Sequence, residues 1–480
     1  MIDPRVPLGG LLAASLLLSA CVGNPDTREE VAEQQEVPMA EQWAEGAADG
    51  KVADNWIDSF QDATLTAMVA EAMANNSSLA QVAGRVSEAE AQATLAGAQL
   101  KPTVSAALGA TGTDGGSAFG AGLQASWELD VWDRMGQAAE AAVQDLLAAQ
   151  SDLVGARNLI AARVSDAWFL SISARQQLEL ATNIRNAYKA TRETTEKRKN
   201  AGTAQPGELE LARSDEASAE AKVREKEGAL KNAQRALEIL LGRYPGAELE
   251  VVPELPPLPA PPPAGMPSAL LERRPDVVAA DRRVNAAFNR TGSARAARMP
   301  RIQLTANVGT TSGSLSDALN PSNALWNLGA GLVAPIFDGG RLKAEQAVAT
   351  AQQEQAVAGY RDVALNAFKE VEDGLSNDAV IRNRLTFIQA SSDELDKALN
   401  IATKRYDAGV IDILALNQVQ LRAFTAREQV VALRAEQLRQ RVSLYLALGG
   451  DFESVPDDLA PSPEQEAKMR EEQAAADAAK

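Results

Sequence analysis

The only cysteine of the chain, Cys21, stands where one specific reaction could take place. It closes the tetrapeptide Leu18-Ser19-Ala20-Cys21 at the end of a 13-residue apolar run, 6–18. Such a run is too short to span a bilayer as a helix and has the length of a signal-peptide core. The tetrapeptide has the form of a bacterial lipobox, in which the thiol is lipidated and the cysteine becomes the mature N-terminus. We predict a signal peptide over 1–20 and a lipid anchor on Cys21.

Val22 follows the cysteine. In some bacteria, an aspartate at this position would retain a lipoprotein at the inner membrane. The valine therefore favours the outer membrane. Elsewhere the chain has no run of 18 or more apolar residues, so we expect no transmembrane helix.

Other chemistry-bearing residue patterns are missing from the sequence. It contains no histidine, so a His/Cys zinc site is excluded, and a single cysteine cannot form a disulfide within one chain. No carboxylate pair or serine-nucleophile context has suitable spacing, and Gly339-Gly340 lacks the other glycines and the Lys-Ser/Thr of a phosphate loop. We therefore predict a chain that is not an enzyme and that binds no cofactor or metal.

The formal charge of −18 is concentrated near the two ends. The segment 21–55 and the tail 451–480 are acidic and polar, while the middle of the chain is close to neutral. Nucleic-acid binding needs a basic face, which this distribution disfavours. We expect 21–55 to be an extended, lipid-anchored segment and 451–480 to be an acidic tail.

Four stretches alternate between apolar and polar or small residues, which predicts strands with one face of each kind. Each is about as long as a tilted membrane-spanning strand, which needs roughly ten residues. Trp127 and Trp326 stand near strand ends and suit a membrane interface, although an ordinary sheet packed on helices is the alternative. The predicted strands are 103–111, 118–129, 301–309 and 326–336.

Four strands are too few for a membrane barrel. An open edge would leave unpaired backbone groups in hydrocarbon, and the smallest membrane barrels have eight strands. Several chains would therefore have to pool their strands, and three chains would supply twelve.

Long Ala-rich helical patterns follow each pair of strands, so the chain reads as two copies of one unit. Their interior residues step by three and four, as Leu414, Asn417 and Leu421 do, which predicts coiled-coil packing. We expect a first repeat over 56–252, a Pro-rich linker, and a second repeat over 268–450. The finer predicted bounds are a linker at 253–267, a helix at 275–298 and long helical hairpins at 137–242 and 341–448.

Four motifs in this order give the chain a resemblance to the outer membrane efflux proteins, the TolC-like channels, and most to their lipoprotein subgroup that serves resistance-nodulation-division pumps. The resemblance implies an α+β membrane protein whose homotrimer forms a twelve-stranded barrel in the outer membrane and a helical tunnel across the periplasm. It also implies a periplasmic adaptor protein and an inner-membrane pump as partners. The motifs are Leu18-Ser19-Ala20-Cys21, Leu271-Glu272-Arg273-Arg274-Pro275-Asp276-Val277, Pro335-Ile336-Phe337-Asp338-Gly339-Gly340-Arg341 and Arg405-Tyr406-Asp407-Ala408-Gly409-Val410.

In that family, rings of side chains constrict the inner end of the tunnel near the hairpin turns. The resemblance assigns this role to Tyr406 and to Glu208, which can accept its hydrogen bond from a neighbouring hairpin. Some members carry acidic rings at positions where this chain has none, and Asp407 and Asp412 are the nearest carboxylates. Three carboxylates around a threefold axis would favour cations, whereas the alternative for both is a solvated turn.

Each hairpin must turn at a glycine, which supplies the required backbone freedom. The turns are expected at Gly202-Thr203 and at Gly409-Val410, and the resemblance makes them the contact for the adaptor.

Three functions fit this sequence. The first is the passive exit duct of a tripartite efflux pump, which the lipobox and the Arg273-Arg274-Pro275-Asp276 match favour. The second is the outer channel of a type I protein secretion system, which would use the same tunnel. The third is a lipid-anchored periplasmic coiled-coil scaffold with no pore.

Overall fold

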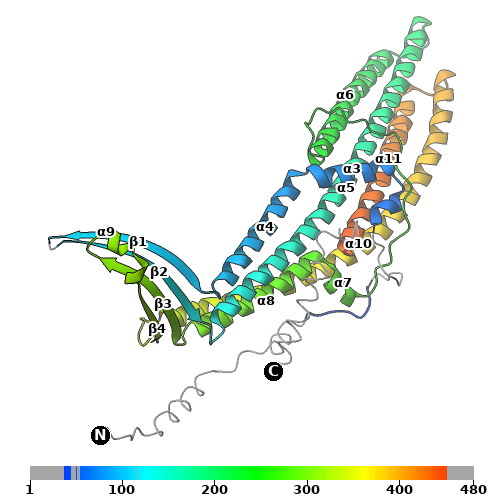
Figure 1. The fold of residues 1–480 in the computed structure, drawn as a ribbon. Coiled ribbons are helices and arrows are strands. Elements are labelled where there is room, and N and C mark those ends of the chain that lie inside the picture. The colour runs from blue at the N-terminus through cyan, green and yellow to red at the C-terminus, as the bar shows by residue number, and fades with distance from the viewer. Residues whose placement is uncertain (1–36, 45–49, 51–54, 115, 451–480) are drawn as a thin grey trace, which may run out of the picture. The chain divides into compact units, whose positions relative to one another are not determined.

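The computed structural model describes residues 37–44, 50, 55–114 and 116–450 of the chain. It is mostly helical and contains one small sheet (Figure 1). Two compact units are present, each assembled from segments that lie far apart in the sequence. The described part of the sheet unit is mainly 84–152 and 276–365, and that of the hairpin unit is mainly 55–83, 153–275 and 366–450.

The sheet unit contains one antiparallel sheet of four strands in the order β1-β2-β3-β4 (Figure 1). Its two faces follow from the alternation, because successive side chains point to opposite sides of a strand. The strands are β1 (Thr103–Thr113), β2 (Gly116–Leu129), β3 (Arg301–Ser312) and β4 (Leu325–Val333).

Strand ends differ from the expected bounds. Strands β1, β2 and β3 extend further than expected at the end next to the β1–β2 turn or the β3–β4 loop. Strand β4 starts one residue earlier than expected and ends at Val333, three residues before the expected 336. Pro335 has no amide hydrogen, so the ladder cannot continue through it. The short helices α9 (Leu315–Ala318) and η2 (Pro321–Asn323) lie between β3 and β4.

Helices join this sheet at one end. They are the later part of α4 (Ser77–Ala98), the first part of α5 (Arg134–Asn200), α8 (Pro275–Ala296) and the first part of α10 (Arg341–Asp407). Ion pairs from Arg283 to Asp152 and from Arg290 to Asp145 connect α8 to α5. The first long helix begins three residues before the expected 137, directly after Asp133 at φ 57°. Helix α8 ends two residues before the expected 298.

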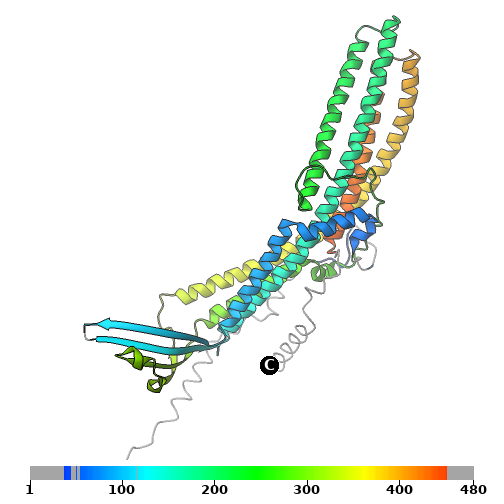
Figure 2. The same ribbon diagram turned by 45° about the horizontal axis from the view of Figure 1, so that its top comes forward.

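The hairpin unit contains the remaining lengths of α5 and α10, which pair with α6 (Glu208–Leu240) and α11 (Ile413–Ala447) (Figure 2). Both α5 and α10 have 67 residues, which is about 100 Å of helix at 1.5 Å per residue. The helices stop at Leu240 and Ala447, one or two residues inside the expected hairpin ends of 242 and 448.

Aromatic side chains pack together in the core of the hairpin unit, near the C-terminal end of α11. Trp56, in η1 (Trp56–Phe60), stacks on Tyr445 with ring centroids 5.7 Å apart, and Phe60 packs on Phe169. Asp62 caps α3 (Ala63–Asn75), and its second oxygen accepts a hydrogen bond from the Trp168 indole.

The expected linker 253–267 is extended up to Met266, and Pro267 opens the short helix α7 (Pro267–Arg273). Arg441 donates to Pro259 O at 2.7 Å, and the Trp43 indole donates to Gly265 O at 3.0 Å. The linker is therefore held against the helices by side chains from two other parts of the chain.

Among the described residues, no helix has the length and apolar character needed to cross a membrane. The predicted signal peptide 1–20, the lipidation site Cys21, most of the segment 21–55 and the tail 451–480 lie outside the described residues.

Candidate functional site at the hairpin tips

The two hairpin turns have the same backbone design. Gly202 and Gly409 both adopt the left-handed conformation, with φ of 73° and 72°. The residue after each glycine donates from its amide to a carbonyl five residues earlier, Thr203 to Arg198 O and Val410 to Arg405 O. These bonds satisfy carbonyls that a helix end would otherwise leave free. The predicted turn residues thus all lie at the tips.

Tyr406 is buried at the tip of the hairpin unit and is only 1% exposed. Its hydroxyl lies 2.6 Å from Thr195 Oγ1, and its ring lies beneath the Arg198 guanidinium, whose Cζ is 4.7 Å from the ring centroid. Arg198 also donates to Tyr406 O at 3.2 Å. One residue of α10 is thus held by two residues of α5.

Glu208 is also buried, at 6% exposure, in the first turn of α6. Its Oε2 has no hydrogen-bond partner among the described residues. Within one chain, Tyr406 is therefore bonded to Thr195 rather than to the predicted partner Glu208. Leaving a buried carboxylate oxygen without a hydrogen-bond partner is costly.

The two candidate ring carboxylates differ in their surroundings. Asp412 caps α11, since its Oδ1 accepts from Ala415 N at 2.8 Å. Asp407 is the last residue of α10 and is exposed. Asp412 therefore has a structural role in starting its helix, while Asp407 extends into solvent at the tip.

A polar layer deeper between the hairpins was not predicted from the sequence. Asn417 donates to Asp215 at 2.6 Å, and Gln420 donates to Thr191 at 3.3 Å. Burial raises the pKa of Asp215 above its usual value, and the bond from Asn417 opposes this shift. The sequence signal for this layer was the polar Asn417 within the predicted heptad stripe.

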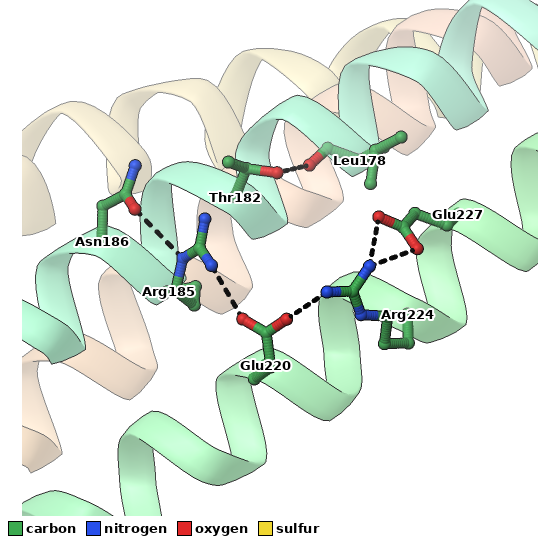
Figure 3. Close-up of polar contacts among 7 residues, drawn as sticks. All are labelled: Leu178, Thr182, Arg185, Asn186, Glu220, Arg224 and Glu227. Atoms are coloured by element: carbon green, nitrogen blue, oxygen red, sulfur yellow. Dashed lines mark hydrogen bonds and ion pairs between the residues drawn. The ribbon is translucent and has the colours of Figure 1, made fainter.

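Ion pairs connect α5 to α6 along the first hairpin. Glu220 accepts from Arg185 and from Arg224, both at 2.8 Å, and Arg224 also pairs with Glu227 (Figure 3). Nearer the tip, Arg192 bonds Glu216 at 2.6 Å. Such partly exposed pairs add little to the stability of the hairpin.

Geometry at the tips favours a mechanical role over a catalytic one. Buried hydrogen bonds there join helices from different hairpins. The described residues include no group of three or more side chains that could hold a metal ion.

Comparisons with known proteins agree with this architecture. The family model described as outer membrane efflux protein matches residues 68–243 and 266–450. The chain is 30% identical to the cation efflux system protein CusC of Escherichia coli over 450 residues, which cover 92% of this chain and 97% of CusC. It is 31% identical to the pyoverdine export outer membrane protein OpmQ of Pseudomonas aeruginosa, over 94% of this chain and 98% of OpmQ.

Solved structures share the fold. A membrane protein from Pseudomonas aeruginosa matches with a TM-score of 0.80 at 30% identity, over 86% of this chain and 98% of that one. The outer-membrane channel OprN matches with a TM-score of 0.81 at 26% identity, over 90% of this chain and all of OprN.

Long paired hairpins joined to a small antiparallel sheet thus define a TolC-like outer-membrane channel. The chain belongs to the outer membrane efflux protein family. It resides in the outer membrane and serves as the exit channel of an efflux pump. Members of this family are transport channels, which is the class that the sequence motifs predicted.

Proposed function

We propose that three copies of this chain form one exit duct. Their pooled strands make a twelve-stranded barrel in the outer membrane. The four long helices of every copy together line one passage through the periplasm. The observation that carries this proposal is a sheet of four strands in which no other described segment pairs with the two edges, β1 and β4. Open edges in lipid must be paired, and pairing each with another copy closes a ring.

The faces of the sheet support the same arrangement. On one face, Leu108, Leu328 and Leu332 are 82%, 73% and 69% exposed. An apolar surface this large is covered by lipid in the proposed barrel. On the other face, Gln124 lies opposite Asn307, and Asn307 opposite Asn327, which suits a water-filled lumen.

The hairpin tips are proposed to form the gated inner end of the duct. Tyr406 and Glu208 hold it closed, and Asp407 of three chains lines the aperture. A periplasmic adaptor binds the turns at Gly202-Thr203 and Gly409-Val410, and a resistance-nodulation-division pump supplies energy and selects the cargo. The relatives' names differ in cargo, a cation for one and pyoverdine for another, which fits selection by the pump.

A lipid on Cys21 is proposed to anchor the N-terminus. Cys21→Ser should leave the protein without a lipid, because no other thiol exists. Metabolic labelling with a fatty acid measures this directly, and label retained by the Ser variant would rule out the assignment.

Two measurements on full-length protein in detergent test the trimeric duct. Analytical ultracentrifugation should show a single species of three chains, and the same sample should conduct ions in discrete steps in planar bilayers. A well-behaved monomer with intact β-structure would refute the pooled barrel. A trimer without conductance would instead support a scaffold.

A further inference from the structure

Two consecutive large apolar side chains project from the turn between β4 and α10. Ile336 and Phe337 are each 93% exposed, more than any other large apolar residue that the structure describes. An exposed pair of this size costs free energy in water and usually marks a surface that something else covers. The pair belongs to the sheet unit and lies just beyond the open edge strand β4.

The turn that carries this pair is fixed rather than loose. Asp338 accepts hydrogen bonds from the amides of Gly340 and Leu342, both at 2.9 Å, which caps the start of α10. Gly339 and Gly340 have φ of 67° and 89°, values that favour glycine. The backbone directly after Ile336 and Phe337 is therefore held in one conformation, which lowers the entropy cost of docking this turn.

Two exposed leucines precede the other edge strand, β1, and are taken together as the second patch. Leu95 is 67% exposed and Leu100 is 36% exposed. This segment is held in place too, because the Trp127 indole donates to Leu100 O at 2.9 Å. Backbone bonds from the amides of Leu100 and Lys101 to carbonyls three residues earlier complete the turn.

The strand register places both patches at the same end of the sheet, on opposite edges. Thr103, at the start of β1, is level with Ser126, Thr305 and Gly329 through three successive pairings. Val333, the last residue of β4, lies opposite Arg301, the first residue of β3. Since the strands alternate in direction, β4 runs antiparallel to β1 of a following copy. The end of β4 in one copy then lies beside the start of β1 in the next.

We infer that Ile336 and Phe337 of one copy pack against Leu95 and Leu100 of a second copy, forming an apolar contact at each subunit boundary. This inference rests on the proposed pooling of strands. Each copy carries one half of the contact on each edge, so the interface is head-to-tail and closes on itself in a ring. The contact joins the subunits at the end of the sheet where β4 leads into α10, next to the paired edge strands.

Cysteine cross-linking tests this contact in the full-length protein. Phe337→Cys combined with Leu100→Cys, treated with a short bismaleimide, should give covalently linked dimers and trimers on a denaturing gel. Each single variant should stay monomeric on that gel, which controls for Cys21, the only native cysteine. The matched control combines Phe337→Cys with Thr111→Cys, near the far end of β1, and should give no linked species.

The second pair, Ile336→Cys with Leu95→Cys, covers the case in which replacing Phe337 disturbs assembly. Ultracentrifugation of each variant reports the trimer independently. A trimeric protein in which neither pair cross-links would overturn the inference and leave lipid as the cover of Ile336 and Phe337. A parent protein that is not trimeric would instead defeat the proposed duct itself.

Discussion

The hydroxyl of Tyr406, on α10, lies 2.6 Å from the hydroxyl of Thr195, on α5, although 211 residues separate them in the chain. Both groups are buried, and Arg198 lies over the ring of the tyrosine. This contact joins the first hairpin to the second at the tips. It is a bond that must break if one hairpin is to move away from the other.

Removing that bond should weaken closure of the proposed gate. A buried neutral hydrogen bond contributes about 0.5–1.5 kcal/mol net, so three copies together bias the aperture substantially. Tyr406→Phe combined with Glu208→Ala should raise single-channel conductance several-fold without an adaptor present. Thr195→Val should act in the same direction, because it removes the other partner of the bond.

Tyr244→Phe is the matched control, since Tyr244 is 89% exposed and its hydroxyl has no comparable partner in the described residues. Its conductance should equal that of the parent. If the trimeric Tyr406 and Thr195 variants also conduct like the parent, this contact is not the latch, and Asp407 becomes the next residue to test.

Some of this site could be predicted from the sequence and some could not. The glycine turns follow from local backbone requirements, which few other residues satisfy. The Tyr406–Thr195 bond depends on how two long helices are rotated about their axes, and a heptad pattern fixes that rotation only coarsely. The same limit affected the predicted interior stripe of α11. Two residues of that stripe, Leu414 and Leu421, are 58% and 64% exposed in a single chain.

A buried ion pair should make a large contribution to the stability of the hairpin unit. Arg441 and Asp378 are 0% and 3% exposed, and their Nη2 and Oδ1 atoms are 2.7 Å apart. Asp378→Ala would leave the arginine buried without its counter-charge, which typically costs about 3–5 kcal/mol. Thermal melting followed by helical circular dichroism should show a clear drop in the midpoint.

Because Arg441 also bonds Pro259 O, the same variant should expose the Pro-rich linker to proteolysis. Glu394→Ala is the control, as Glu394 and its partner Lys397 are both largely exposed. It should melt like the parent. Equal melting of the Asp378 and Glu394 variants would show that the buried pair adds little.

Asp166 should make the stability of the hairpin unit depend on pH. Burial raises the pKa of Asp166 to about 6, Arg439 opposes this shift, and Glu436 adds to it. The fold therefore prefers the protonated carboxyl, so stability is lost as pH rises through 6 and is regained as it falls toward the unfolded-state value near 4. At pH 7 the penalty is about 1–2 kcal/mol after allowance for solvent screening.

Asp166→Asn imitates the protonated form and should melt at a higher temperature than the parent at pH 7. The difference between the two proteins should shrink toward zero at pH 4. A difference that stays constant across this range would mean that the aspartate does not titrate there.

Strand pairing in the sheet unit should depend on one close approach of backbones. Gly309 lies opposite Gly122, and a Cβ built at 309 would lie 2.8 Å from Ala121 O and 3.0 Å from Gly122 Cα. Neither neighbour can turn aside, because both belong to the backbone of the paired strand. Gly309→Ala should therefore force β2 and β3 apart and reduce the yield of trimer extracted from membranes.

Gly331→Ala is a matched control in the same sheet, on the same face, because a Cβ there meets no atom within 4 Å. It should assemble like the parent protein. Trimer yields of both variants can be compared by size-exclusion chromatography after extraction in one detergent. A Gly309 variant that assembles as fully as the Gly331 variant would show that the sheet opens to accept a methyl group at no measurable cost.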